Sequence, residues 1–228
     1  MNGYMRRVLA AYLASAALST SPGISASMLP AMEDFPMNLV DGIIDEVGDS
    51  EMSSDEKRKA LSYIATDRRA EVRIRICEML MNQMESRTME SFIPLLTQLS
   101  EDKDPSVRNE LRRAVVATLE HADVLTRTDM VATLALSPSK NLRFILTTAL
   151  KEDFFCLGVP SVLSILAEDS SVRVRRAVVD VAMSRMNENP VAYQGVLKTL
   201  MDDSRPHVRN AAKHAVVDLR HRHYGWCT

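Results

Sequence analysis

The 228-residue chain contains little glycine, few aromatic residues and few cysteines. Its seven glycines never cluster, which excludes a glycine-rich phosphate-binding loop and disfavours a turn-rich all-β fold. Three scattered cysteines provide neither a disulfide framework nor zinc-ligand spacing. The net charge of −2 provides no basic excess for binding nucleic acid. Hydrophobic residues make up 46% of the chain, and 14 residues are methionine. This composition indicates a helical protein with an aliphatic core.

Acidic residues are absent from the first 32 positions. Arg6 and Arg7 precede an apolar run from Val8 to Leu18, and small residues follow up to Ala26. This pattern predicts a cleavable secretory or mitochondrial presequence over residues 1–26, within a presequence and linker region 1–35. A helix packed on the fold and a membrane-surface anchor are the alternatives, whereas the run is too short to span a membrane. The protein is expected to be exported or organellar if these residues are cleaved, and cytoplasmic if they are retained.

The rest of the chain repeats one motif, in which four residues separate an Asp from a Val-Arg dipeptide. The arginines recur every 32 to 35 residues, a spacing that indicates one structural unit repeated along the chain. The copies run from Asp67 to Arg73, from Asp102 to Arg108, from Asp169 to Arg175 and from Asp203 to Arg209, and a degenerate copy runs from Ser137 to Arg143.

Aliphatic residues keep the same register on both sides of this motif. One lies three positions before each Asp or Ser, as Leu99 does, and others follow the Val at intervals of four, seven and eight, as Leu111, Ala114 and Val115 do. Such spacing is typical of amphipathic helices, so each unit is predicted to be a helix, a short turn and a helix. The segment from Met37 to Val47 is predicted to form one further helix that caps the array.

Helix pairs of this length with this turn motif resemble HEAT repeats, and the segment FIPLLTQLSEDKDPSVRNELRRAVV is similar to repeats in scaffold subunits of protein phosphatases. The resemblance covers residues 53–222. It implies an all-α fold, a right-handed α-solenoid of about five HEAT-like helix pairs with an N-terminal capping helix. This repeat domain is expected to occupy residues 36–222, and residues 223–228 to form a tail. In that family the turn Asp and the Arg form a polar ladder between successive repeats. The resemblance gives this role to Asp67, Asp102, Asp169, Asp203, Arg73, Arg108, Arg143, Arg175 and Arg209, and Ser137 departs from the pattern.

The sequence contains little that indicates catalysis. Three histidines spaced by seven, His207, His214 and His221, share one side of the last helix, but a solvated helix end is expected there rather than a metal site. HEAT-like DNA glycosylases need a basic concave face with aromatic residues, whereas this chain has a net charge of −2 and only 5% aromatic residues. Iron hydroxylases of this fold need paired His-Glu ligands in several repeats, whereas this chain has only Glu120-His121, in reversed order. No catalytic, cofactor-binding or metal-ligating residue is predicted. The alternative function is an enzyme of HEAT-like fold, of either the lyase or the nucleic-acid-repair type.

One feature indicates binding. Two and nine positions after the Val, where the second helix of each unit should face the concave surface, the sequence often carries apolar residues instead of polar ones. They are predicted to line one groove for a protein partner, unless neighbouring helices bury them. These candidate partner-binding residues are Ile74, Met81, Val116, Phe144, Met183 and Val217. The sequence therefore favours a non-catalytic interaction scaffold or adaptor, with protein partners, no cofactor, no transmembrane span and no nucleic acid.

Overall fold

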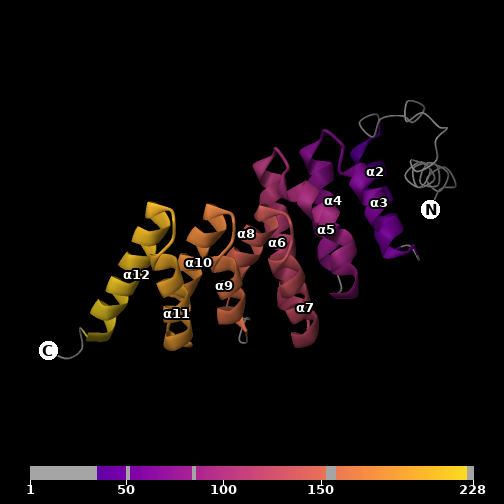
Figure 1. Ribbon diagram of the computed structural model, residues 1–228. Coiled ribbons are helices and arrows are strands. Elements are labelled where there is room, and N and C mark those ends of the chain that lie inside the picture. Colours follow the sequence, from indigo (N-terminus) through magenta and orange to yellow (C-terminus); the bar gives the residue numbers. More distant parts are fainter. Residues whose placement is uncertain (1–34, 50–51, 84–85, 153–157, 225–228) are drawn as a thin grey trace. The chain divides into compact units, whose positions relative to one another are not determined.

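The computed structural model describes residues 35–49, 52–83, 86–152 and 158–224, and side chains at 82–88 and 219–224 are not described (Figure 1). The predicted presequence over residues 1–26 lies outside these ranges. Every regular element in the described residues is a helix, so the fold class is an all-α solenoid of helix pairs. No helix in this part of the chain combines the length and the apolar character needed to cross a bilayer.

Within the described residues, five helix pairs follow one leading helix, as the sequence predicted. The leading helix is α2 (Met37–Asp49). The pairs are α3 (Ser54–Ile64) with α4 (Ala70–Gln83), α5 (Ser86–Ser100) with α6 (Pro105–His121), α7 (Val124–Ala135) with α8 (Lys140–Ala149), α9 (Val159–Ala167) with α10 (Val172–Ser184), and α11 (Pro190–Met201) with α12 (Pro206–Tyr224).

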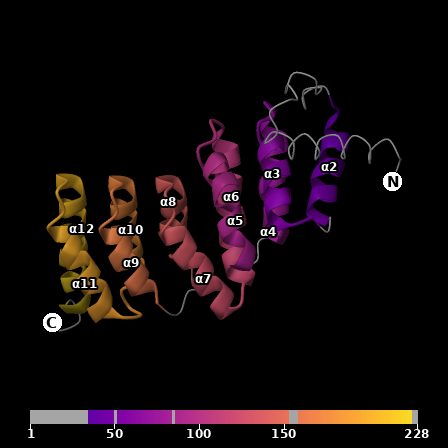
Figure 2. The same cartoon turned by 45° about the vertical axis from the view of Figure 1, so that its right-hand side comes forward.

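The chain forms two compact units that meet inside α7, between Met130 and Val131. In the first unit the helices lie in two layers: α2 and α6 both pack against α4, and α3 packs against α5 (Figure 2). The predicted capping helix α2 therefore lies in the layer of the second helices, where it takes the place of the second helix of a preceding pair.

The second unit repeats this arrangement. Its second helices form one layer, in which α10 contacts both α8 and α12, and its first helices α9 and α11 contact each other (Figure 2). We refer to the solvent-exposed sides of α4 and α6 in the first unit, and of α8, α10 and α12 in the second, as the second-helix face of that unit.

The core includes the aliphatic residues that the repeat register predicted. The positions three before the turn residue, Ile64, Leu99, Leu134, Leu166 and Leu200, are all buried. The second helices bury their own stripe in the same way, and Leu111, Ala114 and Val115 on α6 are fully buried. One residue of this register, Val216, which lies eight positions after Val208, is only half-buried.

The helix starts also follow from local sequence. Ser53 caps α3 in a capping box with Glu56, whose carboxylate accepts from the Ser53 N–H at 2.9 Å. Asp104 caps α6 and accepts from the Ser106 N–H at 2.8 Å, directly before Pro105 at the first helical position. These caps satisfy backbone N–H groups that no helical carbonyl can reach.

Candidate functional site

Three of the turn arginines connect neighbouring repeats, and Arg73 illustrates the geometry. Its Nε and Nη2 donate to the two carboxylate oxygens of Asp102 at 2.5 and 3.0 Å, while its Nη1 donates to the Asp67 carbonyl of its own turn at 2.6 Å. The side chains of Arg73 and Asp102 are only 5% and 9% exposed. Asp102 also accepts from the Asp104 N–H at 2.8 Å, so each charged group in this rung is matched by several hydrogen bonds.

The same rung occurs twice in the second unit. Arg143 binds both oxygens of Asp169 at 2.5 and 3.0 Å, and Arg175 binds those of Asp203 at 2.5 and 3.1 Å. Each of these arginines donates Nη1 to a carbonyl of its own turn, as Arg209 also does at the last turn, to the Asp203 carbonyl at 2.6 Å. The turn residue Asp67 instead bonds Arg69 within its own turn, at 2.8 Å.

Arg108 differs from the other rung arginines. It is exposed, and it donates to the Asp102 and Lys103 carbonyls of its own turn at 2.5 and 3.0 Å. Among the described residues no carboxylate accepts from it, and the register position that would supply one is Ser137. The role of Arg108 in a rung stays a prediction, and Ser137 offers a hydroxyl at the register position where the other rungs have a carboxylate.

The rungs make stability depend on pH. Burial alone would raise the pKa of the Asp102 carboxyl, but hydrogen bonds from Arg73 and from the Asp104 N–H outweigh it and lower the pKa. For Asp203 the hydrogen bond from Arg175 is the largest cause of its lowered pKa. A carboxyl whose pKa is lower in the folded protein stabilises the fold above its unfolded pKa of about 3.9, and this contribution is lost as the pH falls through the folded value.

We expect urea unfolding to give similar free energies at pH 7 and pH 5, and a clear loss below about pH 4. Asp203→Asn removes one such carboxyl while keeping an oxygen acceptor. Its loss of stability between pH 5 and pH 3 should be smaller than that of the unchanged protein. An identical acid-induced loss in both proteins would contradict the assignment of this pH dependence to the rung.

The six predicted partner-binding residues all lie on second helices, and none is buried. In the first unit Ile74 and Met81 on α4 and Val116 on α6 are half-buried. In the second unit Phe144 on α8 and Met183 on α10 are half-buried, and Val217 on α12 is 47% exposed. Neighbouring helices therefore cover these side chains in part and leave apolar surface in contact with water in each unit.

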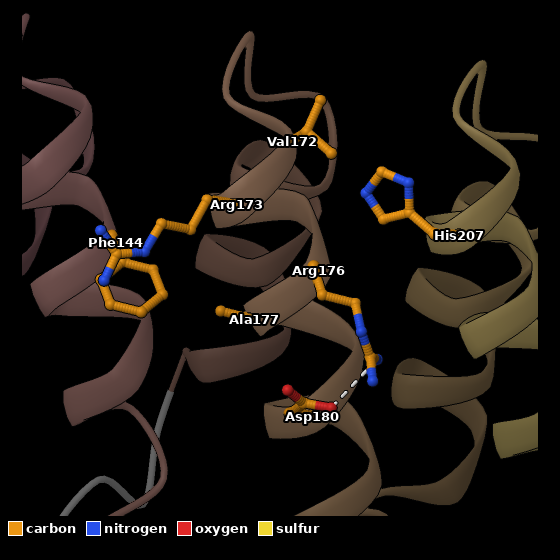
Figure 3. A pocket seen from close by; sticks show the side chains of 7 residues that line it. All are labelled: Phe144, Val172, Arg173, Arg176, Ala177, Asp180 and His207. Carbon is orange, nitrogen blue, oxygen red and sulfur yellow. Dashed lines mark hydrogen bonds and ion pairs between the residues drawn. The ribbon is translucent and has the colours of Figure 1, made fainter.

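A pocket of about 520 Å³ opens on the second-helix face of the second unit (Figure 3). Three consecutive second helices build it, because α10 packs between α8 and α12. Phe144 comes from α8 and His207 from α12, and α10 contributes the rest. The lining residues are Phe144, Val172, Arg173, Arg176, Ala177, Asp180 and His207.

Two contacts organise the charged residues of this pocket (Figure 3). The Arg173 guanidinium lies over the Phe144 ring, with its Cζ atom 3.7 Å from the ring centroid. Arg176 forms an ion pair with Asp180, one helical turn further along α10, at 3.1 Å. The arrangement places apolar surface and two guanidinium groups side by side, with one carboxylate that already has a partner.

Of the pocket residues, the sequence identified Phe144 as a candidate for partner binding and His207 only as one of the three histidines spaced by seven. Arg176 and Asp180 lie two and six positions after Val174, which is the register that identified the second-helix face. The predicted binding surface does not include them because it consists only of the apolar residues in that register. The sequence register does not identify Arg173, because its contact with Phe144 joins two different helices and a register describes only one helix at a time.

The described side chains offer little for metal or thiol chemistry. They contain no group of three or more His, Cys, Asp and Glu residues that could hold a metal ion. His221 and Cys227 lie outside the described side chains. Cys77 is fully buried, and burial raises the pKa of its thiol to about 12, so it is not activated as a nucleophile.

No protein-family model matches the sequence, and the curated proteins also give no match. Among solved structures, a designed armadillo repeat protein in complex with the peptide (KR)4 is similar at 15% identity and a TM-score of 0.36, over 78% of this chain and 81% of that one. A computationally designed armadillo repeat protein for modular peptide recognition is similar at 12% identity and a TM-score of 0.38, over 93% and 97%. Because these identities and TM-scores are low, the fold is defined by the chain's own helix pairs.

Proposed function

We propose that the protein is a non-catalytic scaffold or adaptor that binds a protein partner on the second-helix faces of its repeats. The observation that carries this proposal is the apolar surface on these faces, at Met183, Phe144 and Val217 in the second unit and at three residues in the first. Apolar side chains that stay in contact with water across several consecutive helices favour association with another macromolecule. Methionine adapts its shape to an apolar partner at little cost.

The pocket chemistry supports binding over acid–base catalysis. Asp180, the only carboxylate in the lining, is exposed and ion-paired with Arg176. A general base must lie within hydrogen-bond reach of the proton that it removes, whereas this carboxylate already accepts from Arg176 at 3.1 Å. An ion pair beside an apolar floor instead suits the recognition of a peptide.

We also infer that the repeats are of the HEAT type. The inference is supported by the rungs from Arg73 to Asp102, from Arg143 to Asp169 and from Arg175 to Asp203, because each joins one repeat to the next at the turn. The six predicted partner-binding residues do not take part in these rungs. The arginines of the rungs thus serve the architecture and leave the second-helix face to bind the partner.

Met183→Asp tests the proposed binding face. We expect the variant to keep its helical circular dichroism, because Met183 is only half-buried, and to lose partner binding by about tenfold, since one apolar contact contributes roughly 1–2 kcal/mol. Partners would be identified by quantitative mass spectrometry after co-purification from the natural source, with each variant expressed at the natural level.

Ile165→Asp is the matched control, because Ile165 is 56% exposed on the first helix α9. It makes the same chemical change on the other layer of helices and should leave partner recovery unchanged. If Met183→Asp unfolds the protein, Val217→Asp repeats the test at a residue that is already 47% exposed. Equal recovery of partners by the unchanged protein and all soluble variants would place the binding surface elsewhere.

A further inference from the structure

We propose that the pocket between α8, α10 and α12 binds an acidic peptide segment, with a carboxylate of the peptide on Arg173 and an adjacent apolar side chain against Phe144 and Val172. This inference rests on the proposed function, since it names the chemistry of the partner segment at one part of the second-helix face. A peptide that carries Asp or Glu next to an aliphatic residue matches both halves of the pocket.

The position of Arg173 is the first argument. Its guanidinium is stacked on the Phe144 ring at 3.7 Å, which fixes one flat side of the group against an aromatic surface. The N–H donors of a guanidinium lie in its plane and point past the edge of the ring, so stacking leaves them available for a carboxylate. Because the ring already restricts the side chain, less conformational entropy is lost when the ligand binds.

The local balance of charge is the second argument. Arg173 has no carboxylate partner among the described residues, whereas Asp180 is already bonded to Arg176 at 3.1 Å. The carboxylates of the flanking turns, Asp169 and Asp203, are likewise engaged in rungs. An uncompensated guanidinium is therefore left at the pocket, and a ligand carboxylate is the group that complements it.

The apolar floor and the size of the pocket are the third argument. Phe144, Val172 and Ala177 supply apolar surface next to the charged groups, and the volume of about 520 Å³ accommodates one or two side chains. A free phosphate ion would leave this floor uncovered. A nucleic-acid strand needs a longer basic surface than this pocket offers, in a chain whose net charge is −2.

The test uses the full chain and a fluorescein-labelled peptide of three Asp-Glu-Ser-Leu repeats, with binding measured by fluorescence anisotropy. The matched probe has Asn-Gln-Ser-Leu repeats, which keeps the size and the apolar residues and removes the charge. We expect the acidic probe to bind about tenfold more tightly, and its affinity to fall as NaCl increases, because the added ions screen exposed charges. Equal affinity for the two probes would overturn the proposal.

Arg173→Gln should weaken binding of the acidic probe about tenfold and leave the amide probe unaffected. Arg173→Lys keeps the charge but loses the planar fork and the stacking, and it should recover only part of the affinity. Arg112→Gln on α6 is the control, since it removes one exposed arginine from the first unit and should change the affinity less than twofold. Equal effects of Arg173→Gln and Arg112→Gln would indicate general charge attraction and overturn the assignment of the site.

Two competitors separate other anions from the peptide. Inorganic phosphate at millimolar concentration and a single-stranded oligonucleotide of matched charge should displace the acidic probe poorly. Strong displacement by phosphate would make this a general anion site, and tighter, Arg173-dependent binding of the oligonucleotide would make it a nucleic-acid site. If the acidic probe fails while Met183→Asp still abolishes partner recovery, the peptide chemistry proposed here is wrong and the scaffold function stands.

Discussion

Arg73→Ala is expected to lower the free energy of unfolding of the first unit by about 3–5 kcal/mol. The substitution removes the ion-pair partner of Asp102 and leaves this carboxylate, only 9% exposed, with the Asp104 N–H but without the two hydrogen bonds from Arg73. It also removes the donor to the Asp67 carbonyl, which holds the turn. Urea unfolding followed by circular dichroism measures the effect.

Arg108→Ala provides the matched control at the same register of the next repeat. Arg108 is exposed, and its hydrogen bonds to described residues go to carbonyls of its own turn, so its loss should cost less than about 1 kcal/mol. A double variant, Arg73→Ala with Asp102→Ala, should recover part of the loss, because the isolated buried charge disappears with its partner. Equal costs for Arg73→Ala and Arg108→Ala would show that the buried ion pair contributes nothing beyond the turn.

Leu111→Ala should cost about 2–5 kcal/mol, through the loss of buried surface and the cavity left behind. Leu111 is fully buried on α6, which packs against both α4 and α5, so the cavity would open between three helices. The helices α4 and α5 belong to two different layers and both pack against α6, so the three helices can close the cavity only by moving relative to one another. Calorimetry or urea unfolding measures the change.

Leu125→Ala makes the same chemical change on α7, where the side chain is 79% exposed. It should change the free energy of unfolding by less than about 0.5 kcal/mol, because little surface becomes newly exposed. A cost for Leu111→Ala as small as that for Leu125→Ala would mean that the register assigned to the second helices is wrong.

The helix pairs and the core could be predicted because both depend on local periodicity. An amphipathic helix places its apolar residues three and four positions apart, so the positions of Leu99 and Leu111 in the sequence already identify the buried side of each helix. Caps such as Asp104 and Ser53 act within four residues, and the sequence contains both partners of each interaction. Repetition of the motif then indicated that the pairs stack, since one pair cannot bury its apolar faces alone.

Hydrogen bonds from an arginine of one helix or turn to the end of another helix were decided only by the tertiary structure. Arg127 donates to the Leu119 and Ala122 carbonyls at 2.7 and 2.8 Å, and Arg185 donates to the Glu152 carbonyl at 2.6 Å, so both close helix ends that lack a recognisable capping motif. The first depends on how α7 turns back on α6, and the second depends on how the end of α10 lies against the end of α8. Neither geometry follows from residue spacing.

In the candidate site, too, the sequence predicted some features and the tertiary structure decided others. The sequence by itself placed Phe144, Met183 and Val217 on the side of their helices opposite the core stripe, because helical periodicity fixes the direction of each side chain relative to that stripe. It left open whether neighbouring helices bury them. Only the tertiary structure decided that Arg173 on α10 stacks on Phe144 of α8 and that His207 of α12 completes the pocket. A sequence register assigns a residue to a face of its own helix, whereas a pocket also requires the distance and rotation between helices, which the packing of the whole core sets.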